Sequence, residues 1–222
     1  MTIVKFSFDK EKDSRNIWDA CNLNSPWSDF TKGINPRIVE MCKSNKYEDV
    51  KEKIIQNNSL VYNSPIIQEI ISSFNSAWAV VEKEYFRRLE RIMKTLFCCN
   101  KIDVFLTSIT KCPYNPDISD ANFMVNLFGG IPNMLVTSGH ELMHIQFHNT
   151  YWESIEKKIG KEKTADLKEA LTVLLNIEFK DLLLGYDQGY EKHKELRQFI
   201  AKSWNEDEDF DILIEKCIKF LQ

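Results

Sequence analysis

The sequence predicts a mainly α-helical fold with a small β-sheet, which is an α+β architecture. Glycine and proline are scarce, at 7 and 6 of 222 residues, so long stretches run without a helix-breaking residue. Runs rich in β-branched and aromatic residues, which favour strands, occur at only a few places. The apolar fraction of 43% and the charged fraction of 28% are those of an ordinary globular protein, and the length suits a single domain over residues 1–222.

The N-terminal part of the chain is expected to form one short strand followed by short helices. Residues 3–8 alternate between apolar and polar side chains, which is the period of a strand. Residues 13–58 have helical patterns that are interrupted at 24–26 and at 33–36, where asparagine, glycine and proline favour loops.

The middle of the chain predicts a long helix and then two strands. Residues 64–97 form one helix, or two helices joined near Asn75, because apolar side chains recur there every three or four residues. Residues 102–109 and 122–128 are strand candidates, separated by a turn-rich loop and followed by two glycines. The recurring apolar residues of the helix are Ile66, Ile70, Phe74, Trp78, Val81, Tyr85, Leu89 and Met93.

The C-terminal part is again helical in pattern. A helix is expected over residues 132–150, where Pro132 suits the first turn. A second long helix is expected over 163–184, ending at Gly185. Two further helices are expected over 188–204 and 210–221.

The segment that carries chemistry is His-Glu-Leu-Met-His at residues 140–144. His140, Glu141 and His144 match the pattern H-E-x-x-H, in which both histidines lie on one helix face and can reach one metal ion. Zinc in such sites takes three protein ligands and keeps a fourth position open. It lowers the pKa of its water from 15.7 toward about 7, and Glu141 is placed to accept the proton.

The surroundings of this motif favour a buried site. Apolar residues flank it on both sides, so the helix is expected to be largely covered by the rest of the protein. Buried imidazoles and a buried carboxylate need partners, and a metal ion supplies one. The alternative interpretation is a helix whose polar residues face solvent or satisfy one another. The flanking residues are Leu135, Val136, Leu142, Met143, Ile145 and Phe147.

With this motif the chain resembles the zincin metallopeptidases, and among them the gluzincins, the thermolysin-like clan. The resemblance covers residues 102–193, under half of the chain. It implies a two-lobed cleft with the H-E-x-x-H helix at its floor, between a helical N-terminal lobe over residues 1–100 and a metal-binding catalytic lobe over 101–222. It also implies that residues 121–130 form an edge strand, whose backbone can bind an extended peptide by strand addition.

A third metal ligand is needed, and Glu169 is our choice. A metzincin would place a histidine six residues after His144, but Thr150 stands there and Phe147 stands at the expected glycine, so that class is excluded. Glu169 lies in the string Glu-Ala-Leu-Thr, which resembles the glutamate helix of gluzincins. With Thr172 and Asn176 it would form one polar stripe that faces either the metal or water.

The runner-up for the third ligand is Glu178, which falls within an apolar helix face where a carboxylate is costly unless it is paired. The chain departs from the thermolysin pattern at Val173, where the resemblance implies a carboxylate. The residue that orients a ligand histidine must then come from elsewhere. Thr172 and Asn176 are candidates.

A hydrogen-bond donor for the developing oxyanion is expected beyond the glutamate helix. Tyr190 and His193 are three residues apart and would share one helix face, and gluzincins are similar in drawing a tyrosine or histidine from this region. Tyr186 is an alternative, and a plain amphipathic surface helix is the other interpretation of this segment. His148 extends the histidine stripe too far along the helix axis to reach the same metal.

These observations predict a peptidase with one Zn²⁺ held by His140, His144 and Glu169, Glu141 as general base, and Tyr190 or His193 assisting. The substrate would be a peptide or protein. One alternative is a non-catalytic metal-stabilised or zincin-derived binding protein, against which the intact Glu141 argues. Another is metal-dependent hydrolysis of a bond other than a peptide bond.

Composition bears on partners and location. The net charge is −4 and no basic stripe stands out, so a nucleic-acid partner has no electrostatic support. No stretch approaches the roughly 20 uninterrupted apolar residues that a membrane span needs. No apolar core of signal-peptide length follows the first residues, so we expect a cytoplasmic protein. The oligomeric state and the cleavage specificity leave no mark in the sequence.

Overall fold

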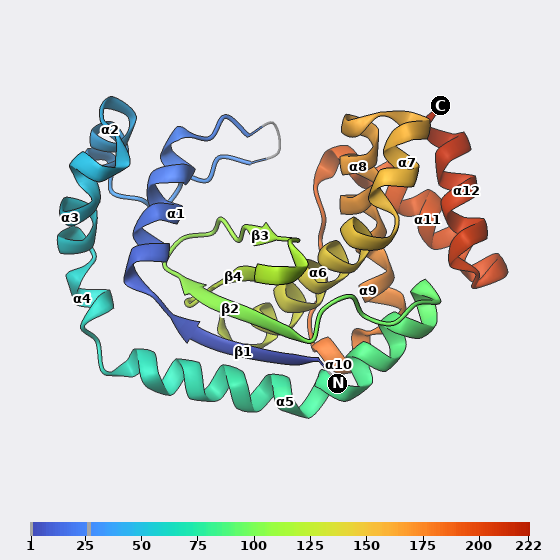
Figure 1. Ribbon diagram of the computed structural model, residues 1–222, viewed down its shortest axis with the longest axis horizontal. Helices are drawn as coiled ribbons and strands as arrows, with labels where there is room; N and C mark the ends of the chain where they lie inside the picture. The colour runs from blue at the N-terminus through green and yellow to red at the C-terminus, as the bar shows by residue number, and fades with distance from the viewer. Residues whose placement is uncertain (1, 26–27) are drawn as a thin grey trace.

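The structure, a computed structural model, describes residues 2–25 and 28–222. Within these ranges the protein is mainly helical, with one small mixed sheet at its centre, as the sequence predicts (Figure 1). Helices α1 to α4 lie on one side of the sheet and helices α6 to α12 gather on the other side (Figure 1). Pro26, in the loop expected at 24–26, lies outside the described residues.

The sheet has four strands in the order β1-β2-β4-β3. Strands β1 (Ile3–Phe8), β2 (Lys101–Thr107) and β4 (Asn122–Asn126) run parallel, and β3 (Tyr114–Asn115) pairs antiparallel with β4. Both strand candidates in the middle of the chain, and the one at 3–8, are therefore confirmed.

The expectation that residues 121–130 form the edge of the sheet is wrong. The turn-rich loop before β4 folds back along it, so that Tyr114 pairs with Phe123 and the backbone N–H of Met124 donates to the carbonyl of Pro113 at 2.9 Å. The side-chain amide of Asn115 closes this loop by donating to the carbonyl of Asp120 at 3.0 Å. The segment around β3 is consequently the edge that lies beside the candidate site.

The long helix α5 (Ile66–Met93) is continuous and runs along β1 (Figure 1). Asn75, where two separate helices could have been joined, lies within this one helix. Its side chain accepts a hydrogen bond from the backbone N–H of Phe6 and donates one to the Phe6 carbonyl, each 3.1 Å long. Further along, the hydroxyl of Tyr85 donates to the carbonyl of Gly139 at 2.6 Å. Helix α5 therefore connects the strand β1 to the helix that carries the H-E-x-x-H motif.

The N-terminal helices have a small apolar core of their own, separate from the main core. This core is formed by α1 (Lys10–Asn22), α2 (Pro36–Ser44) and α3 (Tyr47–Asn57), whereas α4 (Ser59–Tyr62) has no buried residue and packs Val61 against the main core. The fully buried carboxylate of Asp13 joins this group to the sheet, because it accepts hydrogen bonds from Thr107, Ser108 and Tyr62.

The C-terminal helices pack around the main core. The helix expected over 163–184 is instead three short helices, because the helical hydrogen-bond pattern is interrupted at Thr172, whose backbone stays in the αR region, and the chain leaves helical geometry at Phe179. The helices are α6 (Gly130–Thr150), α7 (Trp152–Ile159), α8 (Lys161–Leu171), α9 (Val173–Glu178), α10 (Lys180–Leu183), α11 (Lys194–Asp207) and α12 (Phe210–Leu221), and two 3₁₀ turns cover Ile118–Asp120 and Glu191–His193.

In the part of the chain that the structure describes, no helix has both the length and the apolar character needed to cross a membrane. The buried apolar residues form one large cluster around the sheet and the C-terminal helices, and the smaller N-terminal one. The two-lobed cleft and the division into lobes at residue 100 remain predictions.

Candidate metal centre

Helix α6 presents the H-E-x-x-H motif from a largely buried position. It passes close to α5 and α10 at Gly139, where a Cβ atom would lie 3.1 Å from Leu183 Cδ1 and 3.2 Å from Tyr85 Cε2. The glycine lets these elements approach, and the next turn of α6 carries His140 and His144. Their ring centroids are 4.2 Å apart, on the same face of the helix.

The third member of the cluster is Glu169 from α8, as expected from the sequence. Its Oε2 lies 3.4 Å from His140 Nε2 and 3.3 Å from His144 Nε2. Tetrahedral zinc with bonds of 2.0–2.1 Å requires neighbouring ligand atoms to be about 3.3 Å apart. Among the described residues this is the one group of three such side chains whose ligand atoms all lie within 4.8 Å of one another.

His144 supplies the sharpest indication that an ion belongs there. The side chain is 2% exposed, and neither ring nitrogen has a hydrogen-bond partner of acceptable geometry in the described structure. Burial, reinforced by the positive charge of Lys168, lowers its pKa to about 3, so the ring is neutral and its lone pair is available. An unpartnered buried imidazole is costly, and a metal ion at the centre of the cluster would remove that cost. The residues present therefore fit a divalent metal.

Asp187 lies behind His140, in the place of an orienting residue for which Thr172 and Asn176 were the candidates in the sequence. Its Oδ1 lies 3.4 Å from His140 Nδ1, on the side of the ring away from Glu169. A carboxylate behind a ligand histidine fixes the ring and its tautomer and raises its basicity.

Thr172 and Asn176 take part indirectly, by holding Asp187 and its neighbours. Asn176 exchanges two hydrogen bonds of 2.8 Å with the backbone of Asp187. The buried guanidinium of Arg197 donates to the Asp187 backbone at 2.6 Å, to its carboxylate at 3.3 Å and to Thr172 Oγ1 at 2.8 Å. Thr172 Oγ1 in turn donates to the carbonyl of Glu169 at 2.7 Å. The polar stripe predicted on this helix thus faces the site.

The charges of the cluster are strongly coupled. Burial lowers the pKa of His140, but the carboxylates of Asp187 and Glu169 outweigh it and raise the pKa to about 10. Burial raises the pKa of Glu169, but the two histidines and Lys168 outweigh it and hold that pKa well below its usual range. Without a metal, the cluster therefore retains a proton at the position that a cation would occupy.

Glu141 is the one motif residue that the ligand cluster leaves free to act on a reactant. It is 7% exposed and lines two cavities, one of about 390 Å³ and one of about 510 Å³. Burial raises its pKa to about 7, which is suitable for a general base near neutral pH.

Of the two predicted donors, Tyr190 lies at the site and His193 does not. Tyr190 lines both cavities next to Glu141. His193 is 2% exposed, and its Nε2 lies 3.0 Å from Asp166 Oδ1. The expected shared helix face is wrong, because Tyr190 is extended and precedes a 3₁₀ turn. Tyr186, the alternative, is 70% exposed at the rim of the larger cavity.

The smaller cavity also holds two residues that the sequence analysis did not single out. Lys168, immediately before the ligand glutamate, donates to Glu169 Oε1 at 2.9 Å and to the hydroxyl of Tyr114 at 3.2 Å. Cys112 lies in the wall of both cavities, and burial raises the pKa of its thiol to about 12. Neither residue belongs to a sequence motif, because the fold and not a fixed spacing brings each of them to the cavity.

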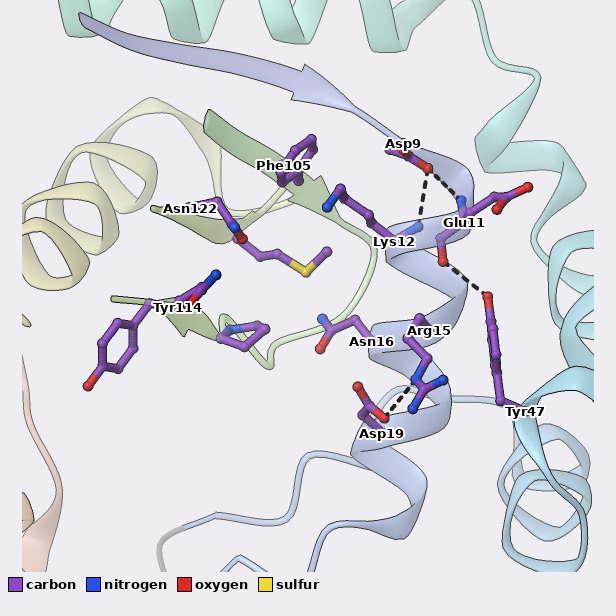
Figure 2. A pocket seen from close by; sticks show the side chains of 13 residues that line it. Asp9, Glu11, Lys12, Arg15, Asn16, Asp19, Tyr47, Phe105, Tyr114 and Asn122 are labelled. Atoms are coloured by element: carbon purple, nitrogen blue, oxygen red, sulfur yellow. Dashed lines mark hydrogen bonds and ion pairs between the residues drawn. The ribbon is translucent and has the colours of Figure 1, made fainter. Parts of the chain in front are cut away.

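A third cavity, of about 560 Å³, lies beyond Tyr114, between α1 and the β3 edge of the sheet (Figure 2). The charges drawn there are largely occupied: Asp9 caps α1, Arg15 pairs with Asp19 at 3.2 Å, and Lys12 lies 4.4 Å from the ring centroid of Phe105 (Figure 2). None of the predicted site residues lines this cavity.

The runners-up lie elsewhere. Glu178 pairs with Arg91 at 2.6 Å and accepts from the Trp204 indole at 2.8 Å, so its carboxylate belongs to an ion pair outside the cluster. His148 stacks on Trp152, with ring centroids 4.8 Å apart, further along α6 as its spacing predicts.

No protein-family model, curated protein or solved structure matches this chain.

Proposed function

We propose that this protein is a zinc-dependent hydrolase that cleaves peptide bonds. The observation that carries the proposal is the cluster of three ligand atoms, in which Glu169 Oε2 lies 3.4 and 3.3 Å from the two imidazole nitrogens, as neighbouring ligands of a tetrahedral zinc would, and Glu141 lines the same cavity. A purely structural zinc is enclosed by four protein ligands and has no use for a base. Here all three candidate ligands line the smaller cavity and His140 also lines the larger one, so a fourth coordination position would face open space rather than a fourth protein ligand.

The protein's own residues then have separate tasks. A bound zinc ion would supply Lewis acidity and a water of lowered pKa. His140 and His144 hold the ion as neutral ligands, with Asp187 fixing the ring of the first. Glu141 accepts the proton of the attacking water and passes it to the leaving amine, for which a pKa of about 7 is suitable.

Tyr190 and the β3 edge complete the proposed site. The Tyr190 hydroxyl is the donor for the developing oxyanion, and burial raises its pKa so that it keeps its proton. The segment 110–114, which leads into β3, forms the wall of the smaller cavity next to the ligand cluster. Its outer backbone groups offer an extended peptide the strand pairing that the resemblance assigned to residues 121–130.

The proposal is tested by metal analysis together with hydrolysis of a mixed peptide library. We expect one zinc per chain in the parent protein, loss of zinc in His144→Ala, and retained zinc without hydrolysis in Glu141→Gln. Glu153→Gln, on the exposed surface of α7, is the matched control and should match the parent in both measurements. Zinc in the parent without hydrolysis of any library member would favour the binding-protein alternative, and no zinc would overturn the proposal.

A further inference from the structure

Lys168 is a buried cation in the wall of the candidate active site. Its side chain is 7% exposed, and it lines the cavity of about 390 Å³ with both ligand histidines and Glu141. Its ammonium donates to Glu169 Oε1 at 2.9 Å and to Tyr114 at 3.2 Å. A lysine has three N–H donors, and these two hydrogen bonds leave the third for a group in the cavity.

Positioning Glu169 does not by itself require a charge. Any neutral donor, such as an amide or a hydroxyl, can hold the outer oxygen of a ligand carboxylate. An ammonium has to lose its hydration to occupy this place, and it competes with the metal for the negative charge of Glu169. The positive charge of Lys168 is therefore unexplained by the metal centre.

The two cavities that meet at Glu141 differ in charge. The smaller one is lined by Lys111 and Lys168 against Glu141 and Glu169, so a divalent ion at the cluster would leave it with an excess of positive charge. The larger one is lined by Glu141 and Asp187 and by no lysine or arginine of the described chain. An anionic end of a substrate is therefore favoured on the Lys168 side and disfavoured on the other.

We infer that Lys168 binds a carboxylate of the substrate and so fixes the direction in which a peptide lies in the site. This inference rests on the proposed function. Only the Glu169 carboxylate separates the ammonium from the two imidazoles, so the recognised group lies about one residue from the scissile bond. Two groups have this chemistry: the C-terminal carboxylate of a peptide cut near its end, and an aspartate or glutamate side chain.

Binding by calorimetry tests the inference without turnover. The protein titrated is the zinc-loaded Glu141→Gln variant, in which the proposed general base is removed. The first pair of peptides is acetylated Ala-Ala-Phe as free acid and as amide. The second probes are acetylated Ala-Glu-Ala and Ala-Gln-Ala, both as amides. We expect at least tenfold tighter binding of the carboxylate member in one pair, and that pair identifies the source of the carboxylate.

Variants at position 168 separate recognition from positioning. Lys168→Gln keeps a donor for Glu169 but removes the charge, and it should bring the affinity ratio close to one while zinc affinity stays within about threefold. Lys168→Arg keeps the charge and should retain most of the ratio. Lys163→Gln, at an exposed position of the same helix, should change neither quantity. Thermal melting of each variant reports whether it folds.

The inference is overturned if the protein with Lys168 intact binds the carboxylate peptide and its neutral counterpart equally well in both pairs. It is also overturned if Lys168→Gln still prefers the carboxylate peptide by the same factor. A Lys168→Gln protein that loses zinc tenfold but keeps the ratio would make Lys168 a positioning residue only. The same titrations on metal-free protein measure the contribution of Lys168 to peptide binding in the absence of zinc. A failure of the proposed function, seen as absent zinc or absent hydrolysis in the parent, is thereby distinguished from a failure at Lys168.

Discussion

At the residue scale, the pairing of His140 and His144 in the candidate site was predictable because their positions follow from helix geometry. His140 and His144 are one turn apart, and this spacing alone places both rings on one face of α6. The position of Asp187 beside His140 was not predictable, because it depends on the turn after α10 and on the hydrogen bond that Arg197 donates to the Asp187 backbone. One signal existed: Arg197 is the only arginine after Arg91, in a region that otherwise uses lysine. An arginine in such a setting indicates a buried, multiply bonded charge.

We predict that Asp187→Asn weakens zinc binding by about 10- to 100-fold, because the ring of His140 loses its carboxylate partner. The affinity is measured by titration against a competing chelator. Asp166→Asn is the control, since Asp166 pairs with Lys192 and His193 away from the ligand cluster. Unchanged zinc affinity in Asp187→Asn would remove Asp187 from the site.

The pKa of Glu141 predicts a pH-dependent stability of the metal-free protein. Its carboxyl has a pKa of about 7 when folded, against 4.5 for the exposed group, so folding is penalised when it ionises. The penalty is absent below pH 4.5 and complete above pH 7. Glu141→Gln removes it and should stabilise the chelator-treated protein by up to about 3 kcal/mol at pH 8.

Urea unfolding at pH 4.5 and pH 8 measures this difference. Glu153→Gln on the surface of α7, where the carboxylate is 84% exposed, should show little change at either pH. A gain for Glu141→Gln that is the same at both pH values would show that ionisation of Glu141 is not its cause.

At the scale of elements, helix α6 and the strands were predictable from period and composition, whereas the break at Thr172 was not. Residues 163–184 contain no glycine or proline and have an unbroken helical pattern. The break coincides with two hydrogen bonds of the Thr172 hydroxyl, which accepts from Arg197 in α11 and donates to the carbonyl of Glu169 three residues earlier. The β3 edge was missed for a related reason, since two paired residues in a turn-rich loop have no strand period.

The contact between α5, α6 and α10 gives a prediction for Gly139. Gly139→Val inserts a branched side chain where a Cβ alone would lie 3.1 Å from Leu183 and 3.2 Å from Tyr85, so these side chains, or α6 itself, must move to make room. We expect a loss of about 1–3 kcal/mol in urea unfolding together with weaker zinc binding. Thr150→Val, at an exposed position of the same helix, should cost little. Parent-like stability in Gly139→Val would mean that the helices are less tightly packed there.

At the scale of the whole molecule, the sheet holds the N-terminal helices in place next to the site. The single buried carboxylate of Asp13 accepts four hydrogen bonds of 2.7–2.8 Å from Tyr62, Thr107 and Ser108. Asp13 showed no pattern in the sequence that would set it apart from other helix-start aspartates. Its partners are about 50 or more residues away in the chain, so only the fold reveals them.

We predict that Asp13→Ala destabilises the protein by about 3 kcal/mol, because buried donors lose their acceptor. Limited proteolysis should then cut first between α1 and α4, while the C-terminal helices stay protected. The control is Asp19→Ala, which removes only a surface pair with Arg15. Cleavage spread evenly over the chain would show that Asp13 does not act on the N-terminal helices in particular.

In the proposed site, one zinc ion is held by two imidazoles and one carboxylate, with a fourth position left to water. X-ray absorption of the zinc-loaded protein measures this directly, because nitrogen and oxygen ligands lie at about 2.0–2.1 Å and sulfur at about 2.3 Å. We predict four nitrogen or oxygen neighbours, of which two have the scattering pattern of imidazole. A sulfur neighbour from Cys112 would fill the fourth position, and the metal would then be structural and not catalytic.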